Sequence, residues 1–389
     1  MSFLDKLLDG VEVEWKPLGE VSNIKTGQSV SKEIIAANPG KYPVINSGRE
    51  PLGFINQWNT ENDPIGITTR GAGVGSITWQ DGRYFRGDLN YSVSIIDKKT
   101  VNDRFLFHLL LEMQKEIQLL CTYQGIPALN AGNLKGLKIP IPCPDNPKKS
   151  LEIQQKIVGI LDTFTELTAE LTAELTARKQ QYNYYREELL TFDENVEWKA
   201  LEEVVLPTSN IRWRDTKKSY RYIDLTSVCR EKNIIIETTE INSNNAPSRA
   251  QKLILKDDVI FATTRPTQQR LCLIPQEYSG EIASTGYCIL RGDTNQVLPK
   301  WIYYWITSNE FKEYVEENQS GSAYPAISDT KVKEFKIPVP SKEEQERIVT
   351  ILDKFDTLTT SISEGLPKEI ELRQKQYEYY RNLLLSFPK

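Results

Sequence analysis

The sequence lacks the features that mark membrane proteins, disulfide scaffolds and histidine-based enzymes. Its longest apolar runs, such as residues 105–113, fall well short of the ~18 residues that a membrane helix needs. Its five cysteines form no Cys-x-x-Cys pair, which favours a reducing cytoplasm over a disulfide or zinc framework. The single histidine, His108, lies in an apolar stretch, where we expect it to pack inside a helix rather than to act in catalysis.

The sequence also lacks a basic excess, which would be the simplest sign of a nucleic-acid-binding protein. Its formal net charge of −5 comes almost entirely from residues 151–195, while residues 196–340 are neutral. A neutral domain can still present one basic face, so the overall acidity does not exclude nucleic acid as a partner. With 389 residues against roughly 100–200 for one domain, we expect two or more domains.

The chain contains an internal duplication. Residues 13–21, which start Val-Glu-Trp-Lys, return at residues 196–204 with seven of nine positions identical, and the period is about 190 residues. Further segments match in pairs: Thr68-Thr69-Arg70 and Thr263-Thr264-Arg265, Pro127-Ala128 and Pro325-Ala326, Lys138–Pro142 and Lys336–Pro340, Leu151–Leu167 and Lys342–Leu358, and Arg178–Arg186 and Arg373–Arg381. The match is strong at the edges of each copy and weak inside, so the two copies share a frame and present different surfaces.

Each copy ends in a predicted long helix. From residue 153 to residue 192, seam residues recur at spacings of three and four, a heptad pattern with one four-residue stutter. About 40 residues of helix extend about 60 Å, too long for a small domain to bury, so we expect the two helices to pair antiparallel. In the second copy, Gly365-Leu366-Pro367 should break or kink the helix.

These patterns predict an α+β protein of two globular domains, separated by two long antiparallel helices and related by a pseudo-two-fold axis. Interiors rich in Gly, Pro and Asn with short β-prone runs favour a sheet with many exposed loops in each domain. The Lys-Ile-Pro-x-Pro strings should end the domains, because their prolines block the continuation of both sheet and helix. The predicted boundaries are 1–148 and 196–341 for the domains, and 149–195 and 342–389 for the helices.

The combination of these motifs resembles the specificity subunit of a type I restriction-modification enzyme. The resemblance rests on the doubled Val-Glu-Trp-Lys starts, the Lys-Ile-Pro-x-Pro exits, the Ile-Leu-Asp helix starts and the Thr-Ala-Glu-Leu units at 168–175. It covers nearly the whole chain and implies two target recognition domains, each reading one half of a split sequence in double-stranded DNA. It also implies that the helices set the gap and dock two methyltransferase subunits, and that restriction subunits join this core.

The sequence carries none of the motifs that methyl transfer, ATP use or DNA cleavage would need. Residues 71–75 (Gly-Ala-Gly-Val-Gly) follow a predicted strand but lack the Gly-Lys-Ser/Thr of a nucleotide loop, so we interpret them as a tight turn. We therefore expect a non-catalytic subunit without cofactor or metal, with S-adenosylmethionine, ATP and magnesium bound by partner subunits. The alternative is a stand-alone DNA-modifying enzyme, either a methyltransferase or a nuclease.

Basic and amide side chains in turns are the candidates for DNA contact. Residues 210–218 hold four basic residues around a tryptophan, a run suited to phosphate contacts, although a merely solvated loop is the alternative. Arg70 and Arg265 end the matched Thr-Thr-Arg strands, where pairing with a sheet carboxylate is the alternative. The DNA-binding candidates are Lys25, Gln28, Ser29, Lys32, Arg49 and Arg70 in the first domain, and Arg212, Trp213, Arg214, Lys217, Lys218, Arg265, Gln268, Gln269 and Arg270 in the second.

The helices carry two further predicted features. Tyr184 points away from the seam that contains Tyr182, since 100° per residue separates them by 160°, and Tyr379 repeats Tyr184. We predict that Tyr184 and Tyr379 contact a partner protein, with simple exposure as the alternative. The Thr-Ala-Glu-Leu units should act as the ruler for the gap through Thr168, Leu171, Thr172 and Leu175.

Overall fold

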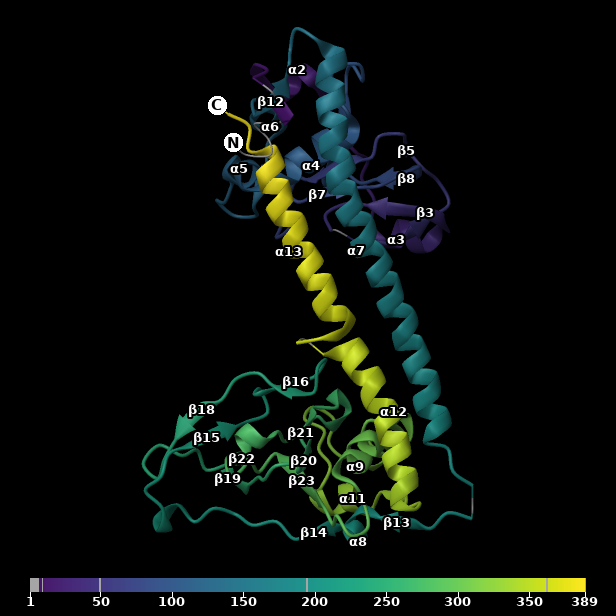
Figure 1. The fold of residues 1–389 in the computed structure, drawn as a ribbon, viewed down its shortest axis with the longest axis vertical. Coiled ribbons are helices and arrows are strands. Elements are labelled where there is room, and N and C mark those ends of the chain that lie inside the picture. The colour runs from purple at the N-terminus through teal and green to yellow at the C-terminus, as the bar shows by residue number, and fades with distance from the viewer. Residues whose placement is uncertain (1–6, 9, 49, 194, 362, 389) are drawn as a thin grey trace. The chain divides into compact units, whose positions relative to one another are not determined.

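The computed structural model describes residues 7–8, 10–48, 50–193, 195–361 and 363–388. The chain divides into two compact units. Unit 1 comprises Met1–Glu170 and Ile370–Lys389, and unit 2 comprises Leu171–Glu369 (Figure 1). Among the described residues, no helix combines the length and the apolar character that crossing a bilayer requires.

Unit 1 contains two four-stranded sheets, with strand orders β2-β9-β6-β7 and β4-β3-β8-β5. Its strands are β1 (Val13–Pro17), β2 (Ser22–Thr26), β3 (Pro39–Ile45), β4 (Phe54–Ile55), β5 (Thr60–Glu61), β6 (Ile65–Thr68), β7 (Ile77–Trp79), β8 (Arg83–Arg86), β9 (Asn90–Ile95), β10 (Cys121–Thr122), β11 (Ala128–Leu129) and β12 (Lys138–Pro142). Its helices are α2 (Leu18–Val21), α3 (Lys32–Ala37), α4 (Asp103–Glu112), α5 (Gln114–Leu119), α6 (Ala131–Lys135) and parts of α7 (Pro147–Leu189) and α13 (Gly365–Leu385).

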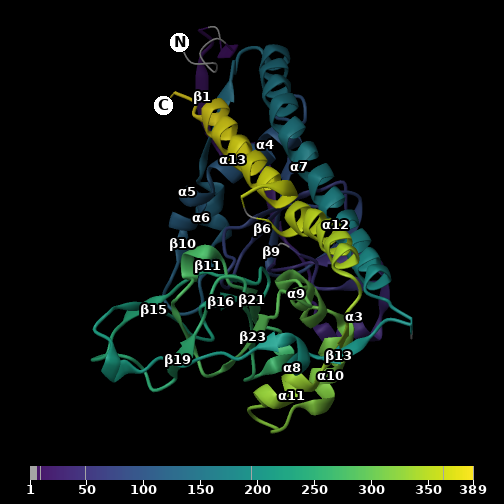
Figure 2. The same ribbon diagram turned by 60° about the horizontal axis from the view of Figure 1, so that its bottom comes forward.

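Unit 2 repeats this plan, with strand orders β14-β23-β20-β21 and β18-β15-β22-β19. Its strands are β13 (Trp198–Ala200), β14 (Val205–Leu206), β15 (Tyr220–Ile223), β16 (Val228–Cys229), β17 (Ile234–Ile235), β18 (Thr239–Ile241), β19 (Ala250–Leu253), β20 (Val259–Ala262), β21 (Leu271–Leu273), β22 (Ile282–Ser284), β23 (Tyr287–Gly292) and β24 (Lys336–Pro338). Its helices are α8 (Leu201–Val204), η1 (Trp213–Asp215), η2 (Pro266–Gln268), η3 (Gln276–Tyr278), α9 (Pro299–Ile306), α10 (Asn309–Asn318), α11 (Asp329–Glu334) and α12 (Lys342–Thr360), of which α8 and α11 pack together (Figure 2).

The two units share their strand pairing as well as their strand order. In unit 1, β3 pairs parallel with β8, and each of the two has an antiparallel outer neighbour. In unit 2, β15 and β22 form the equivalent parallel pair with antiparallel neighbours. This agreement confirms the predicted α+β class and the internal duplication.

The repeated strings at the two ends of each domain pair with each other. In unit 1, β1 and β12 form an antiparallel ladder in which Trp15 lies opposite Pro140. In unit 2, Trp198 lies opposite Pro338 in the ladder of β13 and β24. Both strands end on a proline of the string, as expected, and Pro140 inside β12 is tolerated because a two-stranded ladder has an outer side where a missing N–H needs no partner. The ladder closes each domain where the long helix begins.

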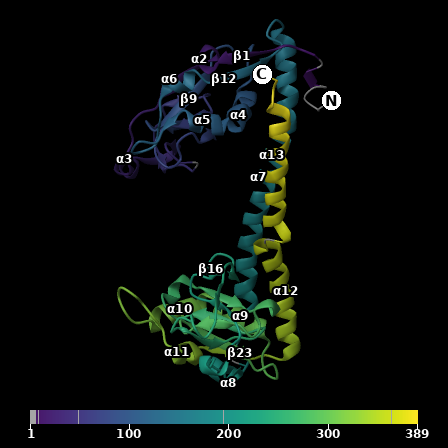
Figure 3. The same ribbon diagram turned by 90° about the vertical axis from the view of Figure 1, so that its left-hand side faces the viewer.

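The long helices pair within each unit, as the heptad pattern predicts. In unit 1, α7 and α13 run antiparallel, and both contribute to one apolar core, with Ile157 and Leu161 from α7 and Leu384 from α13 (Figure 1). In unit 2, the end of α7 lies beside α12 (Figure 3), and the ring of Tyr182 on α7 stacks on the ring of Phe355 on α12, with 6.1 Å between the ring centres. Helix pairing therefore buries the seam at Ile153 and Ile157 and half-buries most of its other residues, while Tyr185 stays 38% exposed.

The second helical segment is interrupted between Thr360, where α12 ends, and Gly365, where α13 begins. Gly365 has a φ of +78°, in the left-handed region that favours glycine. A Cβ atom at this position would lie 2.4 Å from the carbonyl oxygen of Thr357. The break therefore depends on the glycine that the sequence places there.

Candidate nucleic-acid interface

In unit 1, the Thr-Thr-Arg motif follows an inner strand, β6, and is held against a loop. The amide of Gly71 donates to the carbonyl of Pro127 at 2.9 Å, and the amide of Leu129 donates to the carbonyl of Thr69 at 2.8 Å. The Arg70 side chain is exposed at the end of this strand. The two motifs that the sequence repeats, Thr-Thr-Arg and Pro-Ala, are thus parts of one loop assembly.

Unit 2 builds the same assembly. The amide of Arg265 donates to the carbonyl of Pro325 at 2.7 Å, and the amide of Ile327 donates to the carbonyl of Thr263 at 2.9 Å. The Arg265 guanidinium lies 5.2 Å from the ring centre of Tyr324, which is 72% exposed. Arg265 has thus an aromatic neighbour rather than the sheet carboxylate considered as an alternative. A cation held on an exposed ring is a suitable surface for phosphates and base edges.

Backbone strain is concentrated beside this assembly in unit 2. Arg265 and Gln269 adopt φ values of +50° and +47°, which cost about 1–3 kcal/mol for residues other than glycine. Such strain is often found where a loop positions side chains for a ligand. The corresponding turn of unit 1 uses Gly71 and Gly75 at positive φ, with the amide of Gly75 donating to the carbonyl of Thr68 at 2.9 Å. The predicted tight turn at residues 71–75 is confirmed.

The remaining candidates of the first domain lie on two different features. Lys25 on β2 and Gln28 line a polar cavity of about 300 Å³, and the Gln28 side chain accepts a hydrogen bond from Asn59 at 3.4 Å. Ser29 and Lys32 are exposed beyond it, Lys32 as the first residue of α3. Arg49 lies outside the described residues. These positions stay predictions of DNA contact.

In the loop at residues 210–218, the tryptophan has a different place from the basic residues. The Trp213 indole donates to the carbonyl of Ala250 at 2.8 Å and packs edge-on against Tyr220, so it anchors the loop from a half-buried position. Four basic side chains around it are exposed: Arg212, Arg214, Lys217 and Lys218. The four basic side chains are thus exposed to solvent, and Trp213 anchors the loop that carries them.

The turn after β20 is less exposed than the sequence suggests. The Arg270 guanidinium donates to the carbonyls of Leu225 and Val228, so it holds a neighbouring turn of its own domain. Gln268 and Gln269 are half-buried. Because Nη1 of Arg270 makes both of these hydrogen bonds, part of the guanidinium serves the domain itself, and the DNA contact stays a prediction.

The exposed residues at the tips of these loops were not among the predicted DNA contacts. Tyr324 in unit 2 and Tyr123 and Ile126 in unit 1 are large apolar side chains that the structure leaves more than half exposed. They lie just before the repeated Pro-Ala motifs, so the motif spacing was the available signal. An exposed apolar side chain beside an arginine can contact a thymine methyl group or a base face.

Three tyrosines per helix have the same division of roles in both units. Tyr184 and Tyr379 point outward, with 64% and 65% of their surface exposed. Tyr380 stacks on Phe164 at 5.1 Å in unit 1, and Tyr185 stacks on Phe355 at 5.8 Å in unit 2. Their inward neighbours, Tyr377 and Tyr182, are buried or half-buried.

The Thr-Ala-Glu-Leu units lie in the unbroken part of α7. Thr168, Leu171 and Leu175 are half-buried and Thr172 is exposed, while the Thr168 hydroxyl donates to the carbonyl of Phe164 at 2.8 Å. Because α7 is continuous from Pro147 to Leu189, these units add length without a break.

Two cysteine side chains of unit 2, Cys272 and Cys288, are buried. Burial raises the pKa of the Cys272 and Cys288 thiols to about 12, so neither is a thiolate near neutral pH. In the described part of the chain, no three His, Cys, Asp or Glu side chains are grouped to hold a metal ion.

The comparisons with known proteins agree with this arrangement. The family model described as the type I restriction modification DNA specificity domain matches residues 10–178 and 207–372. The chain is 37% identical over 417 residues to the EcoR124I/EcoR124II specificity subunit of Escherichia coli, covering 100% of this chain and 98% of that protein. It is 31% identical to the EcoprrI specificity subunit of the same species, covering 94% of this chain and 92% of that one.

A solved structure shares the fold across the whole chain. The S subunit of a type I restriction-modification system from M. genitalium matches with a TM-score of 0.62 over 98% of both chains, at 19% identity. Two copies of a DNA specificity domain, each followed by a long helix, define the class as a duplicated DNA-recognition protein. The chain belongs to the family of type I restriction enzyme specificity subunits.

Proposed function

We propose that each domain of this chain reads one half of a split DNA sequence while the long helices set the gap between the halves. The observation that carries this proposal is the loop assembly that both units build on the same strand end with different side chains. In the backbone contacts Arg265 takes the place of Gly71, the residue after Arg70: its amide donates to Pro325 as that of Gly71 donates to Pro127, and its guanidinium faces Tyr324. A shared frame with different contact residues is what reading two unrelated half-sites requires.

In this proposal the chain is a non-catalytic scaffold that works in the cytoplasm. Two methyltransferase subunits dock on the helices and supply S-adenosylmethionine, while restriction subunits supply ATP use, magnesium and cleavage. The support is the absence of methyl-donor and nucleotide-loop motifs from the sequence, together with two equivalent helical surfaces. The rival is a stand-alone methyltransferase or nuclease.

The outward tyrosines are the proposed methyltransferase contacts. Tyr184 and Tyr379 are exposed in equivalent places, whereas Tyr182 and Tyr377 serve the helix pairing. Tyr184→Ala and Tyr379→Ala should weaken binding of the methyltransferase subunit and leave the circular dichroism unchanged. If both variants bind the methyltransferase subunit with unchanged affinity, these tyrosines are ordinary surface residues and the proposed contact is wrong.

The test of the whole proposal compares the purified chain with its complex. The chain alone should bind duplex DNA in a salt-sensitive way and methylate nothing, and the complex should methylate a split sequence. Native mass spectrometry should find two methyltransferase copies on each intact chain. Methyl transfer or cleavage by the chain alone would favour the rival, and a single methyltransferase copy would overturn the two-copy arrangement.

A further inference from the structure

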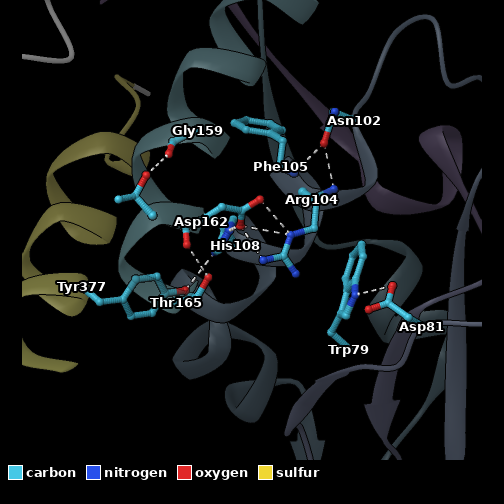
Figure 4. A network of polar contacts seen from close by, with 11 residues as sticks. Trp79, Asp81, Asn102, Arg104, Phe105, His108, Gly159, Asp162, Thr165 and Tyr377 are labelled. Atoms are coloured by element: carbon cyan, nitrogen blue, oxygen red, sulfur yellow. Dashed lines mark hydrogen bonds and ion pairs between the residues drawn. The ribbon is translucent and has the colours of Figure 1, made fainter. Parts of the chain in front are cut away.

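A polar network ties the recognition domain of unit 1 to both long helices (Figure 4). The Arg104 side chain on α4 donates through Nε to both carboxylate oxygens of Asp162 on α7, at 3.1 and 3.2 Å. His108, one turn further along α4, lies 2.7 Å from the same carboxylate through Nε2. Its Nδ1 lies 2.9 Å from the hydroxyl of Tyr377 on α13. Four side chains from three helices thus form one connected chain of contacts.

The donors and acceptors of this network are fixed by chemistry. A carboxylate only accepts, so Nε2 of His108 carries the proton and Nδ1 accepts from Tyr377. Burial lowers the pKa of His108 to about 4, which keeps the ring neutral at neutral pH. Burial raises the pKa of Asp162, but the hydrogen bonds from Arg104 and His108 outweigh this effect, and its pKa lies below the ordinary value. Each hydrogen bond of the network therefore has a defined donor and a defined acceptor.

Unit 2 contains the same device with different side chains. Lys300 and Tyr304 on α9 take the places of Arg104 and His108, and both contact Asp353 on α12 at 2.6 Å. Asp353 ends the second Ile-Leu-Asp motif as Asp162 ends the first. The duplication has thus kept the geometry of a cation and a second donor, four residues apart, on one helical aspartate.

A second contact repeats beside each aspartate. In unit 1, the side-chain oxygen of Gln154 on α7 accepts from the backbone amide of Asn102, at 2.8 Å. In unit 2, Gln345 on α12 accepts from the amide of Leu298 at 2.9 Å. Both glutamines are fully buried. The start of the domain's helix is therefore fastened to the long helix at two points in each unit.

Directional contacts have an effect here that apolar packing lacks. Apolar side chains tolerate small rotations of one helix against another, whereas the hydrogen bonds of a buried ring, such as His108 or Tyr304, are satisfied in one arrangement only. We propose that Asp162 and Asp353 are positioning residues for DNA recognition, each locking its recognition domain at one angle on the long helices so that a single gap length is accepted. This inference rests on the proposed function, since the gap is the quantity that the lock controls.

The test is made with the full chain in complex with its methyltransferase subunits. Asp162→Asn removes the charge that holds Arg104, and Tyr377→Phe removes the hydroxyl bonded to His108. Methylated sites are then mapped by sequencing. We expect both variants to methylate sites whose gap is one base pair longer or shorter, at about tenfold above the wild-type background, with both half-sites unchanged.

The matched control is Asp103→Asn, which changes a half-buried aspartate on α4 that pairs with Lys98 at 2.8 Å and lies outside the network. It should keep the single gap length. A single gap length in both Asp162→Asn and Tyr377→Phe, even with lower melting temperature or total methylation, would overturn the lock and leave these residues a merely stabilising role. If the wild-type complex methylates no split sequence, the proposed function fails instead, so the two failures are distinguishable.

Discussion

His108 illustrates how burial decides the role of a single residue. The sequence predicts a packed helix position, and the structure confirms it with a side chain that is fully buried on α4. Burial is the largest cause of the lowered pKa of His108, and the hydrogen bond to Asp162 opposes it only in part. The residue is thus a neutral donor and acceptor inside the network.

The lowered pKa of His108 makes the stability of unit 1 sensitive to acid. The unfolded chain binds a proton on this ring below its ordinary pKa of 6.5, while the folded chain binds it only near pH 4. Stability should therefore fall as the pH drops from 6.5 toward 4, by up to about 1.4 kcal/mol per pH unit. The His108→Gln side chain still offers an N–H donor but does not titrate. The melting temperature of this variant should therefore fall less than that of the wild type over this pH range. Equal pH slopes for wild type and variant would contradict the assignment.

Tyr324 is the residue most suited to a test of base contact. If the exposed ring beside Arg265 contacts DNA, Tyr324→Ala should relax the preference at one or two base pairs of one half-site, by about tenfold. The other half-site and the gap should stay unchanged, and Ile126→Ala should affect the other half-site. The measurement is methylated-site sequencing. Equal relaxation of both half-sites would point to a loss of affinity rather than of contact.

Sequence reasoning found the arginines of the loop assemblies but misjudged their surroundings. Arg70 and Arg265 were detectable because their motif is repeated. For Trp213 and Arg270, composition alone does not show that the indole and the guanidinium each donate to a backbone carbonyl of their own domain. Tyr324 was missed because a single exposed side chain in a loop leaves no periodic signal.

At the scale of elements, two glycines in the long helices have opposite roles. A Cβ atom at Gly365 would lie 2.4 Å from a backbone oxygen at a φ of +78°, so Gly365→Ala should destabilise unit 2 by more than about 1 kcal/mol. Gly159 lies inside α7, where a Cβ atom meets nothing within 4 Å. Gly159→Ala should therefore stabilise by about 0.5–1 kcal/mol. Thermal unfolding checks both, and a neutral Gly365→Ala would show that the break does not need glycine.

Periodicity predicted the long helices well, and local composition predicted the short strands less well. A seam over some ten turns gives many consistent positions, whereas the ladder of β1 and β12 depends on pairing between residues 13 and 142. The prolines in that ladder predicted where the string ends, but not that it pairs with residues 13–17. Only the partner strand reveals that their missing amides lie on the free side.

At the scale of the whole molecule, the duplication explains why the residues that build the framework differ from the residues proposed to contact DNA. The strand orders, the end ladders and the helical aspartates recur in both units, while the loop tips and the partners of the aspartates differ. The segments that match between the two copies therefore belong to the framework that both units share. The bases that each domain reads depend on the unmatched loops, and for that reason they could not be predicted.

The length of the gap between the two half-sites should depend on the number of Thr-Ala-Glu-Leu units in α7, which lie at residues 168–171 and 172–175. One more Thr-Ala-Glu-Leu unit adds roughly 6 Å of helix and 400° of turn, a net rotation of about 40°. A base-pair step rises roughly 3.4 Å and turns about 34–36°. The rotation matches one added base pair, and the rise would allow nearly two.

Rotational phase is the stricter demand, because a helix that is not parallel to the DNA projects a shorter length onto it. Insertion of one unit should therefore widen the gap by one base pair, and deletion should narrow it by one, with both half-sites unchanged. Methylated-site sequencing of the two variants is the measurement. Replacement of one unit by four alanines is the control, since it keeps the helix length and should keep the gap. A changed half-site, or an unchanged gap after insertion, would mean that α7 does not set the spacing.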